Sequence, residues 1–170
     1  MEKVLKKHFI LLASLMLLFG CEKRLYKTDV IVRNDGLVFE KSRERLFTGI
    51  LVDVYANGEI HSECMYKDGR RHGKYIEWSS DRRKLIFQEY VDGKENGVGR
   101  EWFPNGNVHV EAHFREGVRD GEFIEYFDTG KKKVEGRFEK GLKEGAWKEW
   151  KATESIPKGT FYRHGPLLVE

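Results

Sequence analysis

Five carboxylates recur every 24 residues and are the first side chains in this sequence that could do chemistry. They are Asp53, Glu77, Glu101, Glu125 and Glu149. If each stands on its own β-hairpin, neighbours lie about 10 Å apart, which is wider than the separation of about 5 Å that a retaining glycosidase needs. That spacing also keeps two of them from binding one metal ion. We expect a structural ladder that pairs with lysine and arginine on adjacent strands; an acidic stripe that binds cations or a basic partner is the alternative.

The histidines and the cysteine of the repeat region do not form a reactive group in the sequence. His61 and His109 share a repeat position but are two repeats apart, and His109 and His113 share a strand face at a separation of about 13 Å. Zinc needs three or four ligands close together. Cys64 belongs to a column of mostly small residues and is predicted to be a packed core residue, with His61 on the opposite strand face. We therefore expect no enzyme activity, no metal and no cofactor.

Glycine and aromatic residues repeat with the same period of 24 residues. The leading glycines of the repeats are Gly49, Gly73, Gly97, Gly121 and Gly145. A second glycine follows each of them by 20 positions, and an aromatic residue follows by 17 positions. Self-similarity at this period indicates stacked supersecondary units, so we interpret the leading glycines as structural.

Each unit is predicted to be a β-hairpin. Its first strand is rich in aromatic and β-branched residues, and Asn57-Gly58 or Asn105-Gly106 follows where a tight turn is needed. Arg82 and Glu154 replace this glycine in the second and fifth repeats, so their turns are expected to be of another type.

The sequence therefore predicts an all-β fold, an elongated single-layer antiparallel meander of five 24-residue β-hairpin repeats, preceded by a helical signal peptide. The repeats are expected at 49–72, 73–96, 97–120, 121–144 and 145–165, between a capping hairpin at 30–48 and a tail at 166–170. A cap is needed because an open sheet edge recruits other strands. Pro157 suits the last edge, since proline cannot donate to a strand ladder.

An aromatic column directly follows the carboxylates along the chain. It consists of Trp78, Trp102, Tyr126 and Trp150. Together with Glu77, Glu101 and Glu125 it is the candidate binding face, because aromatic side chains offer a large contact area at little entropic cost. The alternative is that this column forms the hydrophobic core.

The first twenty residues have the features of a secretory signal peptide. Three lysines precede an apolar run from Phe9 to Phe19, which at about 1.5 Å per residue is too short to cross a bilayer as a helix. Leu18-Phe19-Gly20-Cys21 resembles the lipobox of bacterial lipoproteins. The resemblance implies cleavage after residue 20, a diacylglyceryl group on Cys21 and a short tether over 21–29.

The composition excludes two further classes. The chain has 170 residues, of which 13% are aromatic, and such a content argues against disorder. The net charge is only +3, and three of the lysines lie in the signal peptide. A nearly neutral chain has no general electrostatic reason to bind nucleic acid.

The segment 97–121, with its Glu-Trp-Phe-Pro-Asn-Gly turn, resembles the MORN repeats. The resemblance is to the bacterial variant labelled as an antitoxin component of the YwqK type, and it covers about residues 30–165. It implies an elongated array of β-hairpins used for binding, and it supplies no catalytic residues.

These observations lead to one expected function and one alternative. The expected function is a non-catalytic, lipid-anchored scaffold of the cell envelope that binds a protein or another envelope component. In a Gram-negative host the lipid is expected in the outer membrane. The alternative is an antitoxin or immunity protein that neutralises a toxin by binding it. An enzyme that uses Glu101 and Glu125 is the third class considered.

Overall fold

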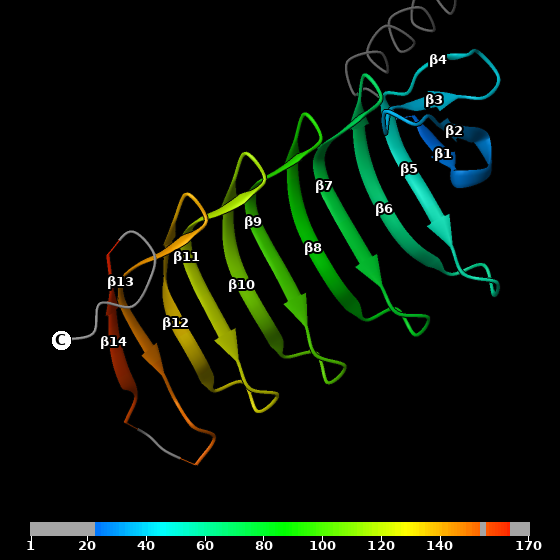
Figure 1. Ribbon diagram of the computed structural model, residues 1–170. Coiled ribbons are helices and arrows are strands. Elements are labelled where there is room, and N and C mark those ends of the chain that lie inside the picture. The colour runs from blue at the N-terminus through cyan, green and yellow to red at the C-terminus, as the bar shows by residue number, and fades with distance from the viewer. Residues whose placement is uncertain (1–22, 154–155, 164–170) are drawn as a thin grey trace, which may run out of the picture.

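The computed structural model describes residues 23–153 and 156–163 of the chain. Eleven of its strands form one continuous sheet, and the other three form a small sheet of order β2-β3-β4. From β5 to β14 neighbouring strands are consecutive in the chain and antiparallel. Figure 1 shows them side by side in a single curved layer. The predicted all-β meander of hairpins is confirmed, whereas the signal peptide, Cys21 and the tail at 166–170 lie outside the described residues.

The elements are β1 (Arg24–Tyr26), the 3-10 helix η1 (Lys27–Asp29), β2 (Val30–Val32), β3 (Val38–Glu40), β4 (Arg45–Leu46), β5 (Gly49–Val54), β6 (Ile60–Lys67), β7 (Arg70–Trp78), β8 (Lys84–Val91), β9 (Lys94–Trp102), β10 (Val108–Arg115), β11 (Val118–Tyr126), β12 (Lys132–Glu139), β13 (Leu142–Glu149) and β14 (Lys158–Tyr162). Within the described ranges no helix is long and apolar enough to cross a membrane.

Two kinds of turn alternate along the sheet. At one edge a two-residue turn such as Asp68-Gly69 joins two strands, with φ of +48° and +76°. Positive φ at both residues is typical of the type I′ turn, whose twist matches that of the flanking strands. At the other edge a five-residue turn such as 55–59 is closed by two hydrogen bonds. Gly58 N donates to Tyr55 O at 2.9 Å, and Tyr55 N donates to Glu59 O at 2.8 Å.

The turn at 79–83 has the same geometry although Arg82 stands in the place of the glycine. Arg82 N donates to Ser79 O at 2.8 Å, Ser79 N donates to Arg83 O at 2.8 Å, and φ of Arg82 is +67°. The prediction of a different turn in the second repeat is therefore wrong. The flanking strands impose the turn, and arginine adopts the left-handed conformation at a cost of about 1–2 kcal/mol.

Replacing Arg82 by glycine is expected to raise the free energy of unfolding by about 0.5–1 kcal/mol, because relief of this strain exceeds the added entropy of the unfolded chain. The exposed ion pair of Arg82 with Glu59 contributes little. The matched opposite change is Gly58→Ala, at φ +84° with open space around the new Cβ, and it is expected to cost about 1 kcal/mol. Urea denaturation of both variants measures the effect, and an Arg82→Gly protein less stable than wild type would contradict it.

The second, third and fourth repeats each contain two β-bulges. The leading glycines of β7, β9, β11 and β13 lie in the first, with φ between +70° and +125°. A Cβ on Gly121 would stand 2.8 Å from the Cβ of His113, so a side chain does not fit there. The second bulge lies near the start of the following strand, where His61 in β6 and His109 in β10 are extra residues in the ladder. An extra residue interrupts the alternation of side chains between the two faces.

The N-terminal cap differs from the expected simple hairpin and tether. β2 and β3 pair as an antiparallel hairpin, but they form the small sheet with β4 and do not extend the main sheet. β1 lies in the predicted tether and pairs in parallel with β5. Parallel pairing needs a long crossover connection, which η1 and the small sheet provide here. Val30, Val38 and the fully buried Phe47 form the apolar core of this cap.

A second apolar core lies in the C-terminal repeats. Ala112, Phe123 and Trp147 are its buried members, and Phe138 and Tyr162 pack against them. Large and small side chains compensate each other across neighbouring strands. The facing pairs are Cys64 with Tyr75, Gln88 with Gly99, Ala112 with Phe123, and Gly136 with Trp147.

Candidate functional site

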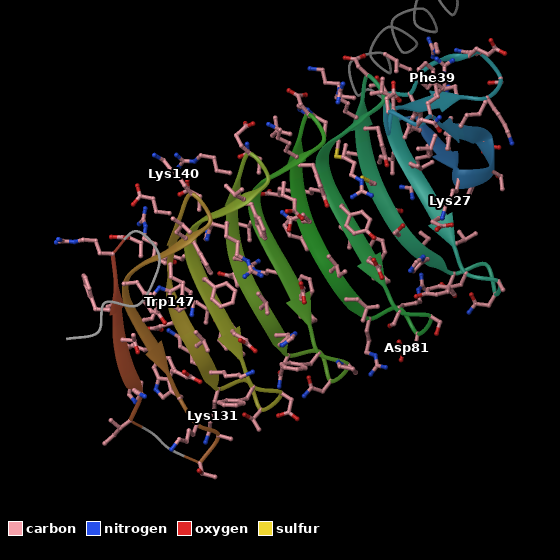
Figure 2. All side chains as sticks on the ribbon, viewed as in Figure 1. Lys27, Phe39, Asp81, Lys131, Lys140 and Trp147 are labelled. Atoms are coloured by element: carbon pink, nitrogen blue, oxygen red, sulfur yellow. The ribbon has the colours of Figure 1, made fainter. Side chains whose placement is uncertain are left out.

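One face of the main sheet carries a row of aromatic rings, and we call it the ring face. The row consists of Tyr66, Tyr75, Tyr90, Phe114, Phe123, Phe138, Trp147 and Tyr162. Neighbouring rings are in contact over part of the row, with 6.5 Å between the centroids of Tyr75 and Tyr90 and 5.0 Å between those of Phe138 and Trp147. Figure 2 shows side chains on both sides of the layer, with Trp147 labelled on β13.

Basic side chains cover most of this row. Arg71 covers Tyr75 and Tyr90, Arg119 covers Phe123 and Phe138, and Lys143 covers Trp147 and Tyr162, with 4.3–5.6 Å between charge and ring centroid. Each such cation–π contact is worth about 0.5–1 kcal/mol at an exposed site. No carboxylate pairs with Arg71 or Arg119 in the part of the chain that the structure describes.

The predicted carboxylate ladder also lies on the ring face. Its partners include two histidines that bridge successive carboxylates. His61 lies 3.6 Å from Asp53 and 3.4 Å from Glu77, and His109 lies 3.9 Å from Glu101 and 3.8 Å from Glu125. Lys27 and Lys133 add two further ion pairs, at 3.0 Å from Asp53 and 2.7 Å from Glu125.

The positions of these histidines differ from the sequence analysis. His61 was expected on the face opposite Cys64, and His109 on the same face as His113. The bulges at His61 and His109 turn both imidazoles onto the ring face, because the extra residue breaks the alternation. The register shifts that cause this arise when two strands pair, so the alternation of apolar and polar residues along one strand does not reveal them.

The predicted binding face is divided between the two sides of the sheet. Glu77 accepts a hydrogen bond from Tyr75 on the ring face at 2.6 Å. Trp78, its neighbour in the strand, lines a different hollow with Ile60 and Glu63. Adjacent residues of a strand point to opposite faces. Trp78, Trp102 and Tyr126 thus belong to what we call the tryptophan face, and Trp150 follows directly after β13; all four are half-buried and lie outside both apolar cores.

A cleft of about 700 Å³ separates the small sheet from the ring face of the first repeats. Val30 and Val38 line it from the small sheet, and Leu51, Cys64 and Tyr66 line it from the main sheet. His61 borders the same cleft, so a base and a thiol share one cavity. Burial raises the pKa of the Cys64 thiol to about 11, however, so the thiol is protonated at neutral pH and is a poor nucleophile.

Cys64 is expected to resist thiol reagents in the folded protein. With a pKa of about 11, only about one molecule in a thousand carries the thiolate at pH 8. The raised pKa stabilises the fold below the pKa of a free thiol, and this contribution is lost as the pH rises towards 11. The test is labelling of the Cys21→Ala chain, in which Cys64 is the sole thiol, at pH 8 with and without urea. Equal rates in both conditions would contradict it.

The geometry offers little for metal or acid–base chemistry. Within the described ranges no three side chains of histidine, cysteine, aspartate or glutamate gather closely enough to hold a metal ion. Each bridging histidine lies between two carboxylates, an arrangement that forms ion pairs when the imidazole is protonated. The arrangement can bind: it presents rings, cations and carboxylates in repeating order along one face.

Comparison with known proteins agrees with this architecture. The family model of the MORN repeat variant matches residues 95–116 and 119–140. In these two adjacent units the chain is similar to MORN repeats. Each match spans one hairpin, β9–β10 and β11–β12. No curated protein matches the chain. The MORN similarity supports a repeat protein that binds or scaffolds.

Proposed function

We propose that the protein is a non-catalytic, lipid-anchored scaffold of the bacterial cell envelope whose ring face binds a protein partner. The observation that carries this proposal is the composition of the ring face. Its rings are half-buried at Tyr75, Tyr90 and Phe114, and arginine and carboxylate side chains surround them. Aromatic residues and arginine are the types enriched at the centres of protein interfaces.

The chemistry of the reactive groups supports a non-catalytic function. Four of the five ladder carboxylates lie beside histidine or lysine, and Cys64 is held protonated by burial. The enzyme alternative is tested by replacing both Glu101 and Glu125 with glutamine and measuring hydrolase activity. An activity of the wild type that this double variant loses would restore the enzyme alternative.

The lipid anchor rests on the lipobox-like sequence that ends at Cys21. Palmitate labelling and cell fractionation of wild type and Cys21→Ala test it. We expect the wild type to take up label and to sediment with membranes, and the variant to lose both. If wild type and variant both stay unlabelled and cytosolic, the lipid anchor is overturned and the cytosolic antitoxin alternative is favoured.

The binding face is tested by a matched pair of charge reversals in a pull-down from cell envelopes. Glu101→Lys changes the ring face, and Glu122→Lys makes the same change at an exposed position of the tryptophan face. We expect Glu101→Lys to lower partner recovery by about tenfold through like-charge repulsion, and Glu122→Lys to leave it unchanged. No specific partner for wild type would overturn the proposed function. A toxin as the recovered partner would favour the immunity alternative.

A further inference from the structure

The pattern of cations over rings on the ring face is interrupted at strand β9. Four ring residues are paired directly across the strands with a charged residue: Tyr66 with Arg71, Tyr90 with Glu95, Phe114 with Arg119, and Phe138 with Lys143. The charged residue is a cation in three of these pairs and a carboxylate in the pair Tyr90–Glu95. On the same strand as Glu95, β9, Gly99 stands where Tyr75, Phe123 and Trp147 stand on β7, β11 and β13. Strand β9 therefore lacks both the ring and the cation that the equivalent strands supply.

A hollow of about 230 Å³ lies at this interruption, and we call it the Gly99 hollow. Tyr75, Tyr90 and Phe114 provide aromatic walls, and Glu95 and Glu101 provide negative charge. Two arginines also line the hollow: Arg100 pairs with Glu111, and Arg119 covers the rings of Phe123 and Phe138. The volume is below that of a pocket for a drug-sized ligand. It therefore suits a single side chain from a partner.

Three groups in the hollow have unused binding capacity. The Glu95 carboxylate makes no hydrogen bond or ion pair with another described residue. No described cation covers the ring of Phe114, in contrast to the rings of the neighbouring repeats. Gln88 is 7% exposed and its Oε1 occupies the place where a Gly99 Cβ would stand, as an acceptor with no donor among the described side chains.

We propose that the Gly99 hollow binds an arginine side chain of the partner protein. A guanidinium there stacks on Phe114, pairs with Glu95 and donates to Gln88 Oε1. The neighbouring repeat shows the stacking part of this arrangement within the chain, where Arg119 covers Phe123 and Phe138 at 5.0 and 5.5 Å. Arginine fits better than lysine because its planar group stacks on a ring and donates several hydrogen bonds at once. The proposal rests on the proposed function, since it names the chemistry that the ring face recognises.

A filled-hollow variant makes a specific test. Gln88→Ala, Gly99→Phe and Glu95→Arg together copy the neighbouring set Ala112, Phe123 and Arg119. The large–small compensation is kept, so the variant is expected to fold, as circular dichroism and urea denaturation will show. Glu122→Gln, on the tryptophan face, is the control.

The probe is N-acetyl-arginine amide, followed by NMR chemical shifts of the Gly99 and Gln88 amides in the folded chain. We expect the wild type to show saturable shifts and the filled-hollow variant to show none. Glu95→Gln is expected to raise the Kd of the probe about threefold, and Glu122→Gln is expected to leave the Kd unchanged. N-acetyl-citrulline amide, the neutral isostere, is expected not to bind. Equal binding of citrulline, or unchanged binding in the filled-hollow variant, would overturn the site; equal binding of N-acetyl-lysine amide would overturn the assignment to arginine.

The envelope pull-down separates this proposal from the proposed function. If wild type and the filled-hollow variant recover the same partner equally well, the scaffold function stands and the arginine site falls. If neither recovers a partner, the scaffold function falls, and the NMR titration still decides whether the hollow binds arginine.

Discussion

Replacing Trp147 with alanine is expected to lower the free energy of unfolding by about 4 kcal/mol, the largest effect of any single change in the repeats. Trp147 is 4% exposed and contacts Phe123, Phe138 and Tyr162, with ring centroids 5.0–6.1 Å away. Truncation removes most of this second apolar core and opens a cavity that a single-layer sheet cannot fill from another layer.

The loss should be local at first, because repeat arrays lose stability unit by unit. Hydrogen exchange of β12, β13 and β14 is expected to accelerate at denaturant concentrations that leave β6 and β7 protected. The control is Phe161→Ala, which removes a ring that is 57% exposed in β14, and it is expected to cost less than about 1 kcal/mol. A cost for Trp147→Ala no larger than that of Phe161→Ala would contradict the assignment of the core.

Adding one methyl group at Gly136 is expected to destabilise the protein by about 2 kcal/mol, the typical cost of overpacking. The indole of Trp147 lies where the Cβ of an alanine at this position would stand. No left-handed backbone conformation occurs at Gly136, so the effect isolates the contact between the methyl group and the indole. Urea denaturation of Gly136→Ala measures it.

A second substitution should restore the stability. Gly136→Ala combined with Trp147→Phe copies the facing pair Ala112–Phe123. Phenylalanine is smaller and also removes the buried Trp147 Nε1, which has no hydrogen-bond acceptor among the described residues. We expect the double variant to be more stable than Gly136→Ala alone, and a double variant whose costs simply add would show that the two positions are not coupled.

The repeat architecture could be predicted from the sequence because its signals are local and occur several times. The leading glycines, the Asn-Gly turns and the aromatic period of 24 residues each act within one hairpin, and repetition makes them visible. The same local signals failed at Arg82, where the strands on both sides of the turn determine the backbone conformation of a residue that is not glycine.

The composition of the two faces could not be predicted from strict alternation. A bulge is a property of two paired strands, since it exists only where one strand has an extra residue relative to its partner. His61 and His109 therefore lie on the face opposite to the one that strict alternation predicts. The residues of the predicted binding face also lie on two faces, with Glu77, Glu101 and Glu125 on the ring face and the tryptophan column on the other.

The sequence by itself determined the all-β repeat, its period and the position of the carboxylate ladder, because each depends on contacts within a hairpin or between identical positions of adjacent hairpins. Only the tertiary structure decided the parallel pairing of β1, the cleft beneath the small sheet and the Gly99 hollow. Each of these depends on how side chains of different repeats, or segments far apart in the chain, fill the same space. Large–small compensation across strands is such a property. Gly99 lacks the aromatic side chain that its repeat position has elsewhere, but in the sheet it makes room for the side chain of Gln88 on the paired strand.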